Sequence, residues 1–218
     1  YEEKDMGIVN LKEIKIDKIT LRIVGTSSIV QHKWIEKMKK QIRDKKMGKK
    51  VSNREKCDPN QEYIDATYIG KETGKYGVPC DAIKQCLVNA AHKDIGIEKT
   101  LVRKSIFIMP QDQDIKEPRD LVLFDKVDEP IMREDIVRVG SGAADLRYRP
   151  EFRNWSIVFT AQLNIDDIPM DSLLNLVNRA GFGVGLQEMR PEKGGDFGRF
   201  TIDQSYVQVD EHKIKGVA

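Results

Sequence analysis

The sequence predicts an α+β fold, built on an antiparallel sheet with helices on one face. Several segments have the alternating apolar pattern of strands, and a smaller number have the spacing of an amphipathic helix. Helices do not alternate regularly with strands, so a parallel sheet made of repeated strand–helix–strand units is not expected. The length of 218 residues suits a single domain over residues 1–218.

The first predicted elements are a strand and a basic helix. Isoleucine and leucine nearly alternate over residues 14–23, and a turn follows at Gly25–Ser28. Ile35, Met38 and Ile42 then recur at helical spacing, with basic residues on the other faces. This pattern predicts an amphipathic helix whose polar side is strongly cationic.

The middle of the chain predicts short strands around one helix. Residues 63–69 form a predicted strand, and a turn bounded by glycines follows it. Pro79 suits the start of a helix, which is expected over Cys80–His92, because its missing N–H would be unpaired there in any case. Further strands are predicted at residues 101–109, 121–124 and 131–139.

The C-terminal part predicts a strand, a helix and a closing strand. Apolar residues share one face of the strand predicted at residues 154–163. A helix over residues 170–180 is expected to end at Gly181, in the position after a helix where glycine is favoured. The closing strand covers residues 197–209. A ferredoxin-like core, the architecture of the RNA-recognition motif, is the commonest arrangement of such elements, and we expect it here.

Basic residues are concentrated in one part of the chain. Residues 33–56 contain eleven lysines and arginines against three acids, whereas the net charge of the whole chain is only +2. Such a concentration indicates a polyanionic partner, either nucleic acid or an acidic protein surface. Residues 47–60 have few large apolar side chains and predict a loop that becomes ordered on a ligand. The candidate phosphate contacts here are Lys45, Lys46, Lys49, Lys50 and Arg54.

A glycine-rich segment lies between the last predicted helix and the last strand. Glycine allows close approach of another backbone, and exposed N–H groups in such loops form anion sites. An isolated glycine-rich segment is equally typical of a flexible linker. If the segment contacts phosphate, the candidate residues are Arg190, Lys193, Gly194, Gly195 and Arg199.

Residues 145–155 interleave three arginines with three aromatic residues. This composition is typical of surfaces that stack bases while neutralising a single strand. Alternatively, the aromatic residues close the edge of the core and the arginines pair with Asp145 or Glu151. The candidate nucleic-acid contacts are Arg147, Tyr148, Arg149 and Arg153.

The cysteines, Cys57, Cys80 and Cys86, include no C-x-x-C pair, so we expect reduced thiols rather than a disulfide framework. The histidines lack metal-binding spacing, and we predict neither a metal nor a cofactor. No apolar run reaches the roughly 18–20 residues of a membrane span, which predicts a cytoplasmic protein without a membrane partner. Met6 is a candidate start, so residues 1–5 are left out of functional reasoning.

Three segments, in this order, resemble the RAMP superfamily, the RRM-like backbone subunits of CRISPR effector complexes. They are IVGTSSIVQHKW at 23–34, YGVPCDAIKQCLVNAA at 76–91 and LLNLVNRAGFGVGLQEMRPEKGGDFGRFTI at 173–202. The middle segment departs from the family, because Cys80–Ala82 replaces a small hydroxyl pair. The chain also resembles small bacteriophage-encoded proteins for which no activity is established.

The resemblance implies a palm, a basic thumb-like insertion at residues 45–62 and a glycine-rich loop at 183–198 that together hold single-stranded RNA. It also implies subunits that stack along the strand. We therefore expect a non-catalytic, phage-encoded protein that binds single-stranded RNA or DNA as a homo-oligomer in the bacterial host cytoplasm. One alternative is a phage protein that mimics or engages a host CRISPR or other defence complex. The other is a metal-independent endoribonuclease, with His32 as the catalytic candidate.

Overall fold

A computed structural model describes the chain at residues 14–33, 43–44, 46–48, 58–92, 96–113, 119–139 and 143–210. The helix predicted around Ile35–Ile42 and most of the predicted basic insertion lie outside these residues. Four candidate phosphate contacts also lie outside them, namely Lys45, Lys49, Lys50 and Arg54. Lys46 lies within the described residues and is exposed.

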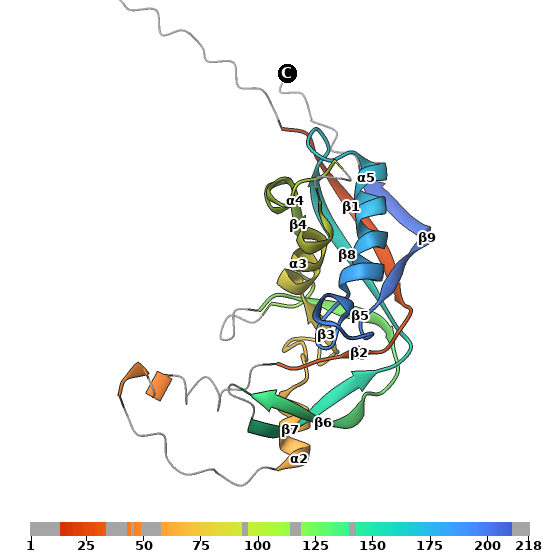
Figure 1. The fold of residues 1–218 in the computed structure, drawn as a ribbon. Helices are drawn as coiled ribbons and strands as arrows, with labels where there is room; N and C mark the ends of the chain where they lie inside the picture. Colours follow the sequence, from red (N-terminus) through yellow and green to blue (C-terminus); the bar gives the residue numbers. More distant parts are fainter. Residues whose placement is uncertain are drawn as a thin grey trace, which may run out of the picture.

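The central sheet has the strand order of a ferredoxin-like fold (Figure 1). Its order is β3-β5-β8-β1-β9, with β4 also paired to β8, and its strand pairs are antiparallel. One unit runs from β1 through α3 to β4, and a second runs from β8 through α5 to β9, which is the split βαβ arrangement. The bounds are Ile16–Gly25 (β1), Gly77–Pro79 (β3), Cys80–Ala90 (α3), Ile106–Ile108 (β4), Leu121–Val127 (β5), Trp155–Asn164 (β8), Met170–Arg179 (α5) and Phe200–Asp210 (β9).

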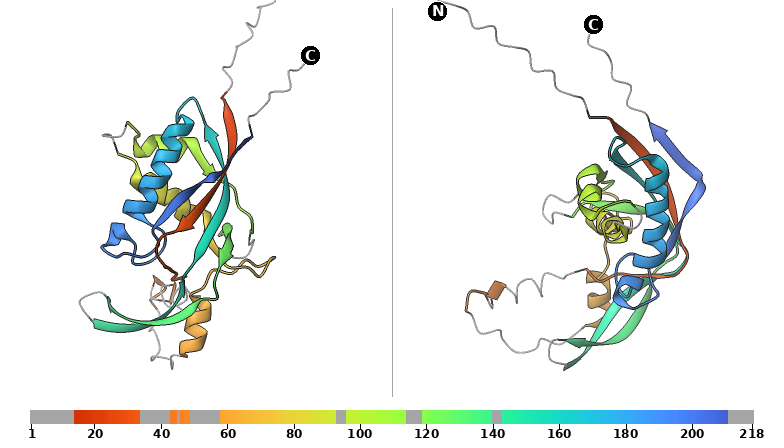
Figure 2. Two further views of the ribbon diagram at one scale, coloured as in Figure 1. Left: turned by 90° about the vertical axis from the view of Figure 1, so that its right-hand side faces the viewer. Right: turned by 45° about the horizontal axis from the view of Figure 1, so that its top comes forward.

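Helices cover one face of this sheet, as the left view of Figure 2 shows, and the predicted α+β class is confirmed. Apolar and polar side chains alternate along β1 and β8, and the register of the two strands places the apolar ones together on the covered face. Its centre consists of six buried side chains: Ile19, Leu21 and Ile23 on β1 and Ile157, Phe159 and Ala161 on β8. The longest described α-helix, α3, has 11 residues. None of the helices in the described ranges is long and apolar enough to cross a membrane.

A second sheet, in the order β2-β7-β6, continues below the core in Figure 1. β6 (Ile131–Val139) pairs along its length with β7 (Ala143–Phe152), and β7 pairs with the short β2 (Ile29–Val30). The strand predicted at 131–139 is confirmed. The sequence analysis did not predict β7, although Leu146, Tyr148, Pro150 and Phe152 alternate with the arginines and acids of its other face.

Two predicted strands are wrong. Residues 63–69 are not a strand, because the helix α2 (Pro59–Asp65) covers the first three of them and only Ile69 forms an isolated bridge, with Tyr76. Asp58 caps this helix by accepting from the N–H groups of the second and third residues that follow it, and Pro59 occupies its first turn. The strand predicted at 101–109 begins as α4 (Lys99–Ser105) and becomes β4 only at Ile106. The pattern of a short apolar run such as this one does not distinguish a helix from a strand.

The remaining predictions at the C-terminus hold, apart from the role of Gly181. The helix α5 does not end at a left-handed glycine but continues into a π-turn, η2 (Ala180–Val184). Gly181 lies against the backbone of Phe200, where a β-carbon would overlap the carbonyl oxygen. The glycine at this position therefore permits close packing of η2 on β9, and after α5 the chain first turns to positive φ at Gly185 (73°).

Candidate nucleic-acid interface

Three segments that are far apart in the sequence meet at one cavity of about 220 Å³. His32 follows β2, Gln85 and Asn89 lie on α3, and Gln187 and Arg190 belong to the glycine-rich loop. The same three segments carry the resemblance described above. The fold therefore concentrates separate sequence motifs in one concave site with several polar groups, which is the usual form of a ligand site.

Buried Gln31 fixes the position of His32. Its side-chain amide donates to the carbonyl at the start of β3 (2.8 Å) and accepts from the N–H of Tyr68 (3.0 Å). The glycine-rich loop is attached beside it, because the N–H of Glu188 donates to the carbonyl of Val30 (3.0 Å). Loop and histidine are thus held to the same short strand.

His32 and Arg147 together present two buried donors. Burial, and next the nearby charge of Arg147, lower the pKa of His32, so its imidazole is neutral at pH 7. Arg147 Nη1 lies 3.4 Å from His32 Nε2, and a guanidinium can only donate, so Nε2 accepts and Nδ1 carries the proton. His32 Nδ1 and Arg147 Nε are both buried without a hydrogen-bond partner in the described part of the chain. In this arrangement the imidazole has no lone pair left with which to act as a general base.

The lowered pKa of His32 predicts how stability depends on pH. Because folding favours the neutral imidazole, the unfolded state takes up the proton first as the pH falls below 6.5. The folded protein then loses at most about 1.4 kcal/mol of stability per pH unit through this group. We expect the difference in Tm between the parent and His32→Gln to shrink as the pH falls from about 7.5 to about 5.5. His92→Gln is the matched control, and a constant difference would contradict this assignment.

The glycine-rich loop is closed by its own hydrogen bonds. The N–H groups of Gly194, Gly195 and Gly198 donate to carbonyls of the loop itself or of the residue before β2. Phosphate contact by this loop therefore stays a prediction that depends on its side chains. Gln187 and Met189 have φ angles of 64° and 51°. This conformation costs a non-glycine residue about 1–2 kcal/mol, and such strain is concentrated at functional sites.

The cationic side chains of the loop differ in their availability. Arg190 lines the cavity, but it also binds Glu192 Oε2 (2.9 Å) and the carbonyl of Gln187 (2.8 Å). Lys193 is exposed. Arg199 is half-buried, and its Nε has no partner among the residues described. Lys193 and Arg199 are therefore better placed than Arg190 to take a phosphate.

Arg149 is buried in an ion pair and is not exposed at the surface. It is buried, and its Nη2 lies 2.8 Å from Asp135 Oδ2, while Nη1 lies 3.7 Å from Glu188 Oε2. Arg153, in contrast, is exposed and lies 3.4 Å from Glu151. Both arginines therefore pair with acidic residues, as the alternative interpretation expected. The partner of Arg149 is Asp135, however, which the sequence did not indicate.

The aromatic residues of segment 145–155 also differ in how far they are buried. Phe152 and Trp155 are buried in the core, as the alternative interpretation expected. Tyr148 is half-buried and pairs in register with Glu134 on the β6–β7 hairpin. Strand alternation therefore places Tyr148 on the opposite face of β7 from Arg147 and Arg149.

Sequence reasoning missed four residues that line the cavity: Tyr68, Gln85, Asn89 and Arg119. Gln85 and Asn89 are separated by four positions on α3, which was a readable signal for a shared helix face. Arg119 had no such signal. It donates to the hydroxyl of Tyr68 at 2.6 Å, and this contact positions its guanidinium beside the cavity.

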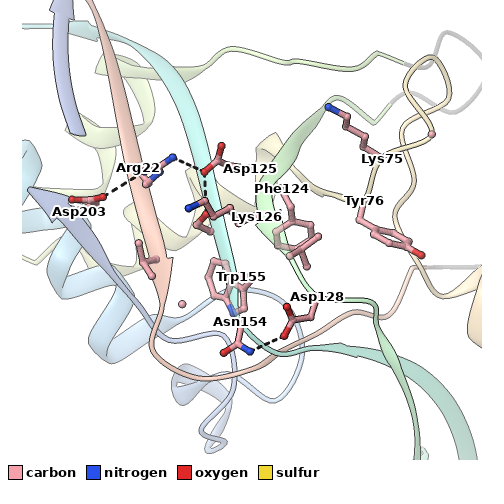
Figure 3. A pocket seen from close by; sticks show the side chains of 15 residues that line it. Arg22, Lys75, Tyr76, Phe124, Asp125, Lys126, Asp128, Asn154, Trp155 and Asp203 are labelled. Atoms are coloured by element: carbon pink, nitrogen blue, oxygen red, sulfur yellow. Dashed lines mark hydrogen bonds and ion pairs between the residues drawn. The ribbon is translucent and has the colours of Figure 1, made fainter. Parts of the chain in front are cut away.

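A second, larger cavity of about 920 Å³ lies at the end of β1 (Figure 3). Its lining has three cationic and three acidic side chains, and Arg22 is paired with Asp125 (2.7 Å) and Asp203 (3.7 Å). The same side of the sheet carries Thr20 bonded to Thr160 (2.9 Å), and three aromatic residues, Tyr76, Phe124 and Trp155, line the cavity. Phe124 and Trp155 are buried in the core, and among the described residues the lining has no excess of positive charge for a phosphate chain.

The thiols and potential metal ligands of the described residues show no reactive cluster. Cys80 and Cys86 are unpaired, and burial raises the pKa of each to about 12. These two thiols are therefore protonated at neutral pH. No group of three His, Cys, Asp or Glu side chains in the described ranges is arranged to hold a metal ion.

Comparisons with known proteins establish no family for this chain. No family model matches the chain, and no curated protein matches it. It is similar to a chain in the cryo-EM structure of the Type III-B Cmr-beta bound to cognate target RNA, with a TM-score of 0.49 and 9% identity. That match covers 90% of this chain and 61% of the other, so the chain spans about three fifths of it. Cmr6 from Pyrococcus furiosus is similar with a TM-score of 0.41 and 10% identity, over 85% of this chain and 97% of Cmr6.

Proposed function

We propose that this chain binds single-stranded RNA or DNA, without cleaving it, at the cavity where the three segments meet. The observation that carries the proposal is the pair of buried N–H donors on His32 and Arg147 that make no hydrogen bond in the described part of the chain, although Asp145 Oδ2 lies 3.7 Å from Arg147 Nε. A buried unpaired donor costs about 1–3 kcal/mol. An acceptor such as a phosphate oxygen would remove that cost on binding.

The charges around the cavity support a phosphate chain as the ligand. Arg119 and Arg190 line it, Arg147 contacts its histidine, and Lys193 projects from the adjoining loop. Contacts of Lys and Arg with phosphate supply affinity for any sequence and release counterions. Binding is therefore expected to weaken steeply as salt is added.

Two wider features belong to the same proposal. The basic residues Lys45, Lys46, Lys49, Lys50 and Arg54 extend the phosphate contacts, and copies of the protein bind side by side along the strand. The sequence resemblance implies a phage origin, and we propose that the protein acts in an infected bacterial cell. Cooperative binding curves, with more than one protein per strand at saturation, would support assembly along the strand.

Binding to labelled single strands of about 30 nucleotides tests the proposal, since such a strand accommodates several sites of about 4–16 nucleotides. Fluorescence anisotropy is measured with RNA and with DNA between about 50 and about 200 mM salt. With about four phosphate contacts, we expect log K to fall against log salt with a slope near −3. An absence of binding to either polymer at the lowest salt would overturn the proposed function.

A further inference from the structure

We propose that the 220 Å³ cavity holds one unstacked nucleobase of the bound strand, so that the protein distinguishes bases as well as binding phosphates. This inference rests on the proposed function and extends it. Phosphate contacts position a strand but carry no sequence information. A base held in a pocket lined by amides would add a preference that depends on the base.

The amide side chains of the cavity carry the inference. Gln85, Asn89 and Gln187 all line it. Gln85 Nε2 donates to Asn89 Oδ1 at 2.6 Å, which leaves Gln85 Oε1 as an acceptor beside Asn89 Nδ2 as a donor. The edges of unstacked bases offer a donor next to an acceptor, and proteins recognise single-stranded RNA through such edges. The amide pair on α3 is therefore complementary to a base edge.

The cavity also offers a planar group for stacking. Arg119 is held by the hydroxyl of Tyr68 (2.6 Å), and its guanidinium carbon lies 5.6 Å from the centre of the Tyr68 ring. Guanidinium planes, like aromatic rings, stack on exposed bases. Because the Tyr68 hydroxyl fixes this guanidinium, little side-chain freedom is lost when a base packs on it.

Size and charge favour a base over another phosphate. A volume of about 220 Å³ corresponds to about seven water molecules at roughly 30 Å³ each, the scale of one base. It lies below the roughly 300–1,000 Å³ of sites for drug-sized ligands. Arg190 is already engaged by Glu192, and Glu188 adds a negative charge to the lining. The groups that remain suit a neutral, planar ligand with donors and acceptors.

Binding of equal-length oligo(A), oligo(C) and oligo(U) tests the inference, with the parent compared with Gln85→Ala/Asn89→Ala. We expect the parent to discriminate between at least two homopolymers by between about 5-fold and about 150-fold, the range of one good pair of base contacts. The double variant should lose this preference and keep its salt-dependent binding. Gln208→Ala, an exposed amide on β9, is the matched control and should keep the preference.

Each other outcome has a defined meaning. If the parent binds all homopolymers equally, base recognition is wrong and the proposed function stands. If the preference persists in the double variant, the cavity is not its source. If the parent binds no oligonucleotide, the proposed function fails and the inference fails with it. Unfolding curves of each variant, together with the milder Gln85→Glu, separate these outcomes from misfolding.

Discussion

Replacing Arg149 by methionine is expected to lower the free energy of unfolding by about 2–4 kcal/mol. Arg149 is buried and lies 2.8 Å from Asp135. Methionine keeps much of the volume but removes the charge, and removing one partner of a buried pair costs about 3–5 kcal/mol. The expected loss is somewhat smaller here, because Arg133 also pairs with Asp135 (3.0 Å). Urea unfolding curves of the parent and the variant measure this difference.

Arg153→Met is the control for this change. The Arg153 side chain is 61% exposed, and its contact with Glu151 lies at the surface. Exposed ion pairs contribute about 0–1 kcal/mol, so this variant should resemble the parent. If Arg149→Met were as stable as Arg153→Met, the buried Arg149–Asp135 pair would not stabilise the β6–β7 hairpin.

Four glycine-to-alanine variants in the glycine-rich loop are expected to differ in a fixed order of stability. At Gly183 a β-carbon meets open space, and Gly194 has a φ of 81° but also open space. At Gly195 a β-carbon would overlap the carbonyl of Met189. Gly198 combines a φ of 69° with an overlap at the carbonyl of Leu186. Comparing the stabilities of the four variants therefore distinguishes the cost of a strained backbone from the cost of steric overlap.

Gly198→Ala should therefore be the most damaging of the four. A left-handed conformation costs alanine about 1–2 kcal/mol, and overpacking adds typically 1–3 kcal/mol. We expect a loss of about 2–5 kcal/mol, or roughly 5–15 °C in Tm for a chain of this size. Gly183→Ala should be close to neutral. If Gly183→Ala and Gly198→Ala had the same Tm, the loop would not have the closed form described above.

Much of the core could be predicted from the sequence. The strand at 154–163 and the helix of 80–92 follow from periodicity, because each buries one regular face. The strand at 131–139 follows instead from its β-branched content. β7 was missed although its residues alternate between apolar and charged, because residues 145–155 were interpreted as a base-stacking segment, whereas the charged face is an ion-pair network with Asp135 and Glu151. The error at α2 came from weighing Tyr63 and Ile64 as strand formers, whereas the cap at Asp58 decides the local structure.

The candidate site was predictable only in part. The sequence identified all three segments that meet at the cavity, but not which side chains face it. Arg149 and Arg147 are two residues apart on one strand face, yet only tertiary contacts assign one to Asp135 and the other to His32. Arg119 is placed beside the cavity by its contact with Tyr68, which lies 51 positions away in the sequence. Side-chain pairing at such distances in sequence has no local signal.

The most direct test of the account compares single-stranded nucleic-acid binding by Arg119→Glu and Lys126→Glu with binding by the parent. Both variants change the charge equally, but Arg119 lines the small cavity and Lys126 lines the large one. We expect Arg119→Glu to weaken binding by at least about tenfold. Lys126→Glu should change little, and Tm values should show that both variants are folded. Equal weakening by the two variants, or none by Arg119→Glu, would contradict a binding site at the small cavity.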